Sequence, residues 1–162
     1  TFHPESYSDD YGIEKLENIL KAIVYLKSNL LITYPNIDEG SENIKKTLIE
    51  FTEKYSKNSF LYRSIGSNLY LSALKLFDVV VGNSSSGIIE APLIGIPSLN
   101  VGERQKGRAA FGEVLNTNGS YDEIIKKLVL LKSNKDNVNL PRRLQISRKL
   151  PSHEIIKRLK QI

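Results

Sequence analysis

Cysteine, methionine and tryptophan are absent from the 162-residue sequence. Without cysteine the protein has no disulfide bond, no thiolate nucleophile and no cysteine-ligated metal site. The missing methionine includes the initiator, so we expect the chain to be an excised piece of a longer polypeptide. No apolar run approaches the roughly 20 residues that cross a bilayer, and no signal-peptide pattern opens the chain. The absence of cysteine does not identify a compartment but fits a reducing cytoplasm, where we expect the protein, and we expect no membrane partner.

Histidine is also scarce, with only two in the chain. Neither His3 nor His153 stands in a ligand-spaced cluster, so we predict no metal site and no bound cofactor. His153 has basic neighbours, and we interpret it as a surface residue. His3 is a candidate acid, base or anion contact near neutral pH, although a structural role is the usual one for a lone histidine.

The composition is that of an ordinary globular protein, with 40% hydrophobic and 25% charged residues. The length suits one compact domain, which we place at 1–162. The net charge is +5. Many of the cations gather near the C-terminus, at Arg142, Arg143, Arg148, Lys149, Lys157, Arg158 and Lys160. A solvated helix face explains them, and because no aromatic residues interleave with them we expect no nucleic-acid partner.

Short β-rich runs alternate with amphipathic helical runs along the chain. Strands are expected at 30–34, 59–65, 78–82, 98–102 and 113–115, and helices at 13–26, 41–55, 69–77, 88–94, 120–131 and 152–159. Ser41 is expected to cap its helix. The three valines at 79–81 predict a strand that is buried on both faces. This alternation predicts an α/β fold, with a parallel sheet covered by helices on both faces.

Ligands of such folds bind beyond the carboxyl ends of the strands, which points to the loops 3–12, 35–41, 65–67, 82–90 and 102–108. The loop 82–90 reads GNSSSGIIE. Free amides and serine hydroxyls at a helix start suit phosphate oxygens. Glu90 would repel phosphate but could accept hydrogen bonds from a sugar diol. A plain helix start with a first-turn glutamate remains the alternative. The spacing G-x-S-x-x-G does not match a nucleophile elbow.

Two further loops carry polar side chains. The loop 102–108, GERQKGR, could hold a diphosphate or a leaving group, or could be a solvated basic loop. The loop 35–41, PNIDEGS, offers Asn36 and Asp38, which are also ordinary turn residues. From the residues alone, both interpretations stay open for each loop.

Four segments together resemble one family. They are HPES (3–6), YPNIDEGS (34–41), GNSSSGIIEAP (82–92) and GERQKGR (102–108). In this order and spacing they resemble the UDP-N-acetylglucosamine 2-epimerases, and the likeness runs from residue 1 to about residue 131. The non-hydrolysing branch tends to have His-Arg-Arg-Glu where this chain has HPES. The likeness is therefore to the hydrolysing branch, which feeds sialic acid and related nonulosonic acid synthesis.

The resemblance implies a Rossmann-like three-layer domain that forms the C-terminal half of a GT-B arrangement and begins inside its first strand. The implied reaction eliminates UDP from UDP-N-acetylglucosamine to give a 2-acetamidoglucal, to which water adds to give N-acetylmannosamine. The implied partners are UDP, a UDP-N-acetylhexosamine and the missing N-terminal domain of the same chain. That domain would supply the acidic residues for proton abstraction, and the full-length protein is expected to be a homo-oligomer. The chain alone should bind UDP weakly and should not turn over.

The resemblance also implies roles for single residues. His3 would stabilise the departing UDP or handle a proton beside the diphosphate. The remaining residues would contact substrate: Ser84 and Ser85 at the phosphates, Gly87 allowing close approach, Glu90 at the ribose hydroxyls, Asn36 on the nucleotide side, Ile65 and Gly66 beside uracil, and Arg104 and Gln105 facing the substrate.

One departure and two alternatives accompany the resemblance. The family usually has a glycine-aspartate turn before its last helix, where this chain has residues 149–153, KLPSH. The end of the chain is therefore expected to diverge.

Two alternative functions stay open. The UDP-sugar half of a GT-B glycosyltransferase would share the serine-rich loop and the carboxylate. A non-enzymatic polyanion-binding module would instead show steeply salt-dependent binding and indifference to Glu90→Ala.

Overall fold

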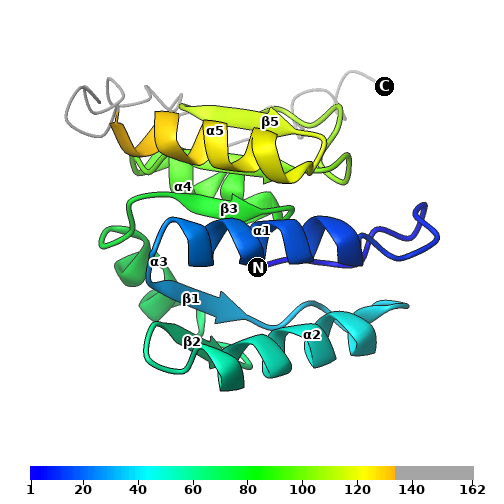
Figure 1. Ribbon diagram of the computed structural model, residues 1–162. Helices are drawn as coiled ribbons and strands as arrows, with labels where there is room; N and C mark the ends of the chain where they lie inside the picture. The colour runs from blue at the N-terminus through cyan, green and yellow to red at the C-terminus, as the bar shows by residue number, and fades with distance from the viewer. Residues whose placement is uncertain (134–162) are drawn as a thin grey trace, which may run out of the picture.

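The computed structural model describes residues 1–133, which alternate strands and helices as predicted (Figure 1). The helices are α1 (Ile13–Tyr25), α2 (Ser41–Lys54), α3 (Ser67–Leu74), α4 (Glu90–Leu93) and α5 (Tyr121–Ser133), with a 3₁₀ turn, η1, at Ser85–Gly87. The strands are β1 (Leu30–Thr33), β2 (Ser59–Tyr62), β3 (Val80–Gly82), β4 (Ser98–Val101) and β5 (Val114–Thr117). The helix predicted at 152–159, the basic C-terminal cluster and His153 lie outside the described residues. Within residues 1–133 no helix is long and apolar enough to cross a bilayer.

The strands form two parallel sheets where the sequence pattern predicts one. In the first sheet β1 pairs with β2, and Leu30 lies opposite Ser59. The second sheet has the order β3-β4-β5, with Val80 opposite Ser98 and Ser98 opposite Val114. The α/β class and the parallel strand direction are thus confirmed, but β1 and β3 are not hydrogen-bonded to each other.

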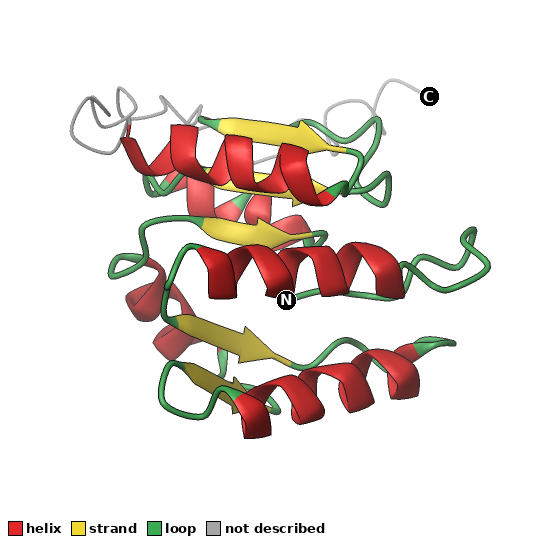
Figure 2. Ribbon diagram, in the orientation of Figure 1, coloured by secondary structure: helices red, strands yellow, loops and turns green. Residues whose placement is uncertain are grey.

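Helices cover both faces of the strands. Figure 2 shows α1, α2 and α5 in front of the strands, and α3 and α4 behind them. Short connections between parallel strands and such helices give a three-layer arrangement of the Rossmann-like type.

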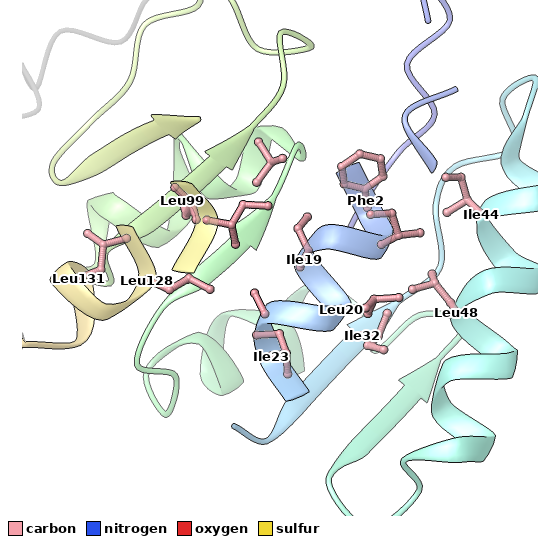
Figure 3. Close-up of a cluster of buried hydrophobic side chains, with 14 residues drawn as sticks. Phe2, Ile19, Leu20, Ile23, Ile32, Ile44, Leu48, Leu99, Leu128 and Leu131 are labelled. Atoms are coloured by element: carbon pink, nitrogen blue, oxygen red, sulfur yellow. The ribbon is translucent and has the colours of Figure 1, made fainter. Parts of the chain in front are cut away.

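A single apolar core joins the two sheets through α1 (Figure 3). The side chains of α1 that enter this core are Leu16, Ile19, Leu20, Ala22 and Ile23. On one side the core continues to Ile44 and Leu48 of α2 and Ile32 of β1. On the other side it continues to Leu99 of β4 and Leu128 of α5. The helical period of the apolar residues in 13–26 therefore positions one helix across both sheets.

Two predictions about the strands are wrong. The three valines at 79–81 are half-buried instead of buried on both faces, because the edge of β3 that faces β1 has no paired strand. By contrast β4, which has a partner on each side, is buried along its whole length. The residues that precede His3 also form no strand in the structure, so His3 follows an irregular segment.

Helices α1 and α2, which each follow a candidate ligand loop, begin in different ways. Before α1, the Asp10 carboxylate accepts hydrogen bonds from the amides of Gly12 (2.8 Å) and Glu14 (2.9 Å). The hydrogen bond from the Ser8 hydroxyl, together with those from the amides, lowers the pKa of Asp10 to about 2. Helix α2 instead begins after Gly40, without a side-chain cap, so the predicted Ser41 cap is wrong.

Candidate functional site

The buried side chain of Asn83 joins two of the segments that the sequence marked for ligand binding. Asn83 follows β3 directly and is completely buried. Its Oδ1 atom accepts a hydrogen bond from the His3 amide (2.7 Å), and its Nδ2 atom donates one to the His3 carbonyl oxygen (2.8 Å). Both polar backbone atoms of His3 are therefore held by one side chain, which places His3 at the carboxyl end of β3.

The backbone carbonyl of Asn83 attaches a third segment, the loop 102–108. Gln105 Nε2 donates to this carbonyl oxygen at 2.7 Å, and Arg104 Nη1 donates to it at 3.4 Å. Gln105 is itself buried, and its Oε1 atom accepts a hydrogen bond from Arg108 (3.0 Å). Both ends of the Gln105 amide thus bind protein groups. The contact of Arg104 is to a neutral carbonyl group, which leaves its positive charge available for an anion.

The His3 side chain is neutral at physiological pH. Burial lowers the pKa of His3 to about 4, and the nearby positive charges of Arg104 and the N-terminus lower it further than the negative charge of Asp38 raises it. The backbone amide of Asn36 donates a hydrogen bond to His3 Nδ1 (3.1 Å). Because Nδ1 accepts, the proton of the neutral ring is on Nε2. His3 therefore offers a directional N–H donor and no positive charge.

The serine-rich loop forms a tight turn at the carboxyl end of β3. The Ser84 hydroxyl accepts a hydrogen bond from the Ser86 amide (3.4 Å), and Ser85 begins η1. The Ser86 hydroxyl is hydrogen-bonded to the Tyr70 hydroxyl of α3. A Cβ atom on Gly87 would meet the Val80 side chain at an ordinary 3.8 Å. Packing therefore does not require glycine there, and close approach of a ligand stays a prediction for this position.

Glu90 is the first residue of α4, and one of its carboxylate oxygens is buried without a donor. Oε2 accepts no hydrogen bond from any residue in the described part of the chain. The Glu90 charge also contributes to the raised pKa of Tyr70, for which burial is the main cause. A buried carboxylate oxygen without a donor is unfavourable. A ligand with hydroxyl groups would supply the missing donors.

The loops that follow β1 and β2 are more exposed. Asn36 is exposed and reaches His3 through its backbone amide. Ile65 is half-buried and Gly66 is exposed, directly before α3. Gly66 has φ 69° and ψ 158°, a conformation that is nearly restricted to glycine. Ile65 and Gly66 directly precede α3, and the hydroxyl of Tyr70 in α3 contacts the serine-rich loop.

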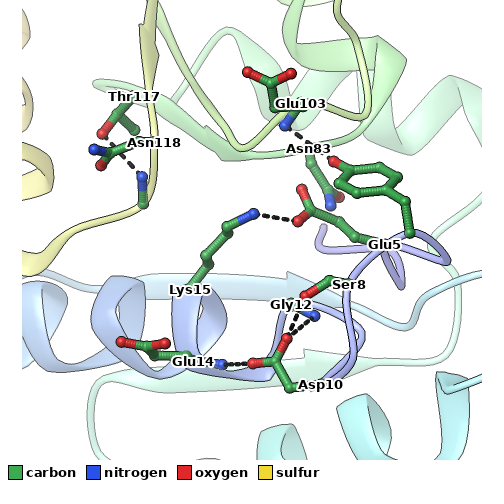
Figure 4. A network of polar contacts seen from close by, with 12 residues as sticks. Glu5, Ser8, Asp10, Gly12, Glu14, Lys15, Asn83, Glu103, Thr117 and Asn118 are labelled. Carbon is green, nitrogen blue, oxygen red and sulfur yellow. Dashed lines mark hydrogen bonds and ion pairs between the residues drawn. The ribbon is translucent and has the colours of Figure 1, made fainter.

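A second buried polar side chain, Glu5, orders the loop that carries His3 (Figure 4). Glu5 is 1% exposed, and its Oε2 atom lies 2.5 Å from Lys15 Nζ of α1. A Cβ atom built on Gly102 would lie 2.0 Å from Glu5 Oε1, so any larger residue would have to displace this carboxylate. The Glu103 amide also donates a hydrogen bond to the Tyr7 hydroxyl (3.1 Å). The first loop is thus attached to both α1 and the loop 102–108.

Sequence reasoning missed three residues that organise the site: Glu5, Tyr70 and Asn83. Asn83 and Glu5 stand inside the segments GNSSSG and HPES, which were singled out for their neighbours. An amide directly after a strand of valines was the available signal for Asn83. Tyr70 had no signal beyond the helical pattern, because its contact with Ser86 depends on how α3 is placed.

An α/β domain whose polar loops converge at the carboxyl ends of parallel strands belongs to the Rossmann-like class of ligand-binding domains. The profile of the UDP-N-acetylglucosamine 2-epimerase family matches residues 1–146. The chain therefore belongs to this family.

Three curated bacterial proteins are similar to the chain. The GDP/UDP-N,N'-diacetylbacillosamine 2-epimerase (hydrolyzing) of Campylobacter jejuni is 33% identical over 79% of this chain and 34% of its own length. The UDP-N-acetylglucosamine 2-epimerase of Neisseria meningitidis is 36% identical over 72% of this chain and 30% of its own length. The polysialic acid biosynthesis protein P7 of Escherichia coli is 32% identical over 77% and 32%. The chain thus spans about a third of the length of these relatives.

Proposed function

We propose that this chain is the UDP-binding part of a hydrolysing UDP-sugar 2-epimerase. The observation that carries the proposal is the convergence of three loops on Asn83, which brings His3, the serine-rich loop and Arg104 to one edge of the strands. In the proposed reaction a base removes the C2 proton, and the C1–oxygen bond to UDP breaks to leave a 2-acetamidoglucal. Water then adds across the double bond and gives N-acetylmannosamine.

The proposed roles at the diphosphate follow from charge. Arg104 supplies the positive charge that the departing UDP needs. His3 is neutral, so it would donate a hydrogen bond from Nε2 to a diphosphate oxygen instead of forming an ion pair. Ser84 and Ser85 would add hydroxyl and amide donors to the phosphates, and Gly87 would allow the close approach. Gln105 is engaged at both ends, so we assign it the positioning of the loop that carries Arg104.

The proposed roles at the nucleoside follow from Glu90 and from the exposed loops. The Glu90 carboxylate would accept hydrogen bonds from the two ribose hydroxyls, which would satisfy its buried Oε2 atom. Ile65 and Gly66 would lie beside uracil, and Asn36 on the nucleotide side near His3.

The proposal also requires groups from outside this chain. The base that removes the C2 proton would come from an N-terminal domain outside this chain, in a GT-B arrangement. A homo-oligomeric full-length protein and a cytoplasmic location stay predictions. On this proposal the 162-residue chain alone releases no N-acetylmannosamine, and substantial turnover by the isolated chain would contradict it.

The substrate has two candidates. The Neisseria meningitidis relative is named for UDP-N-acetylglucosamine, whereas the Campylobacter jejuni relative is named for N,N'-diacetylbacillosamine nucleotides. Assaying the full-length protein with both UDP-sugars and comparing kcat/KM distinguishes the candidates.

The test of the binding site is titration calorimetry with UDP on the full-length protein and its Glu90→Ala variant. We expect the variant to bind UDP at least about tenfold more weakly, because the lost hydrogen bonds are charge-assisted. Glu50→Ala is the matched control, since Glu50 is an exposed carboxylate on α2. Equal UDP affinity of Glu90→Ala and the unmodified protein would rule out the ribose assignment.

A further inference from the structure

The loop 102–108 carries two arginines whose positive charges have no negative partner among the described residues. Neither Arg104 nor Arg108 forms an ion pair within the part of the chain that the structure describes. Glu103 is the only acidic residue of the loop, and its Oε2 atom binds Lys106 Nζ at 2.5 Å. The loop therefore keeps two positive charges that no carboxylate of its own neutralises.

The buried Gln105 side chain connects Arg108 to the same peptide group that Arg104 contacts. Arg104 Nη1 donates to the carbonyl oxygen of Asn83 at 3.4 Å. Gln105 Nε2 donates to this same oxygen at 2.7 Å, and Gln105 Oε1 accepts from Arg108 Nη1 at 3.0 Å. Since the oxygen and nitrogen of an amide are only about 2 Å apart, Arg108 Nη1 lies within about 8 Å of that carbonyl oxygen.

The position of this carbonyl group relates both arginines to the serine-rich loop. The group belongs to the peptide bond between Asn83 and Ser84, and Ser84 is the first of the serines proposed for the phosphates. Two positive charges around one peptide group repel each other. A bound anion would remove this repulsion, and the neutral oxygens that now contact the two arginines cannot.

The turn that returns Arg108 to Gln105 is well defined. Gly107 has φ 79°, in the left-handed region that favours glycine. The Arg108 amide then donates to the Gln105 carbonyl oxygen at 3.1 Å, so Gln105 holds both the backbone and the side chain of Arg108. A guanidinium group has five N–H donors, of which Gln105 engages one. The Arg108 side chain is exposed, so its other donors are accessible to a ligand.

We propose that Arg108 is a second binding residue for the diphosphate of the UDP-sugar, which contacts phosphate oxygens beside Arg104 and is positioned by Gln105. This inference rests on the proposed function of the site. A departing diphosphate carries more negative charge than one guanidinium group neutralises. Two guanidinium groups also offer paired N–H donors to several phosphate oxygens at once. Arg108 would therefore contribute to the binding of UDP and not to the binding of uridine.

The test is titration calorimetry with UDP on the full-length protein and its Arg108→Gln variant. Lys106→Gln is the matched control, because it removes the same charge from the same loop and Lys106 is already paired with Glu103. We expect Arg108→Gln to weaken UDP binding at least about tenfold, and Lys106→Gln to weaken it less than about twofold. Arg108→Lys keeps the charge without the planar fork, so its UDP affinity should lie between those of the unmodified protein and Arg108→Gln.

Uridine separates a phosphate contact from a structural role of Arg108. Its affinity, measured by displacement of UDP, should be the same within about twofold for the unmodified protein and Arg108→Gln, because uridine has no phosphate. An equal loss of uridine and UDP affinity would overturn the inference, since it would mean that the substitution disturbs the whole site.

Failure of this inference is distinguishable from failure of the proposed function. If Glu90→Ala weakens UDP binding while Arg108→Gln and Lys106→Gln bind UDP equally, only the inference is overturned. If the unmodified protein binds no UDP, the proposed function fails, and titration with inorganic pyrophosphate decides the role of Arg108. Pyrophosphate binding that is weaker in Arg108→Gln than in Lys106→Gln would support the diphosphate contact, and equal binding or none would overturn it.

Discussion

The loops that follow the two sheets differ in how firmly the fold holds them. Beyond β3 and β4, Asn83 is 0% exposed and Gln105 is 4% exposed, and their hydrogen bonds connect three segments. Beyond β1, Ile37 is 94% exposed, and the side chain of Asn36 is also exposed. His3 lies between these regions, with its backbone held by Asn83 and its ring contacted by the Asn36 amide.

This difference indicates which part of the proposed ligand each region would contact. The loops beyond β3 and β4 are ordered when the protein folds, so binding a diphosphate there costs little further conformational entropy. The loops beyond β1 and β2 have fewer buried polar contacts and expose more of their side chains. On the proposed function, the firm region would hold the diphosphate and the ribose, and the exposed region would lie beside uracil.

The largest expected difference between the two regions is in the free energy of unfolding when an asparagine in each is replaced by alanine. Asn83→Ala leaves the buried amide and carbonyl of His3 without partners, so we expect a loss of about 3 kcal/mol in the free energy of unfolding. Asn36→Ala removes only an exposed side chain and should cost less than about 0.5 kcal/mol. Urea unfolding of the 162-residue chain measures both. Similar losses for the two variants would mean that the regions do not differ in firmness.

A smaller effect tests the contact of Glu5 inside the firm region. Gly102 and Gly107 lie in one loop with φ 81° and 79°. Alanine at Gly107 meets no atom within 4 Å and should cost only the conformational strain of about 1 kcal/mol. Alanine at Gly102 must also displace the buried Glu5 carboxylate, so we expect a loss of about 2 kcal/mol. Thermal unfolding compares the two variants, and equal Tm values would argue against a fixed Glu5.

Much of the fold could be predicted from the sequence, because its elements have regular periods. The apolar spacing in 13–26 predicted α1, and the valines at 79–81 predicted the strand beside the serine-rich loop. The separation into two sheets could not be predicted, since it depends on which edges find partners. Likewise Ser41 suggested a cap from its residue type alone, whereas Gly40 takes the left-handed conformation that begins α2.

The candidate site was predicted as a set of loops, and its internal order was not. The segments around His3, Ser84 and Arg104 were placed at one edge of the sheet by the general rule for α/β folds. That Asn83 connects them, and that Gln105 is buried, depends on contacts across 80 and 22 residues of sequence. The neutral state of His3 depends on burial, which no local pattern reports.

The smallest expected effect concerns the pKa of His3, on which the two regions act in opposite directions. Arg104, beyond β4, lowers this pKa, and Asp38, beyond β1, raises it. We therefore expect Arg104→Gln to raise the pKa above its value of about 4 and Asp38→Asn to lower it. A ¹⁵N NMR titration of the chain measures both shifts, and His3→Gln assigns the signal because His153 is the only other histidine. Shifts of the same sign would contradict the opposition.

The same titration has a consequence for stability, and its sign follows from the lowered pKa. Between the ordinary value of 6.5 and the folded value of about 4, the unfolded chain binds a proton at His3 that the folded chain does not. Acid therefore favours unfolding, and the stability that a neutral His3 provides is complete above pH 6.5 and is lost as the pH falls towards 4. We expect the free energy of unfolding of the unmodified chain to fall more steeply over this range than that of His3→Gln. The pH dependence due to other groups, including Asp10 with its pKa of about 2, is common to both proteins and cancels in the difference. Parallel curves would mean that the pKa of His3 is the same in the folded and unfolded chain, so burial in the folded chain would not lower it.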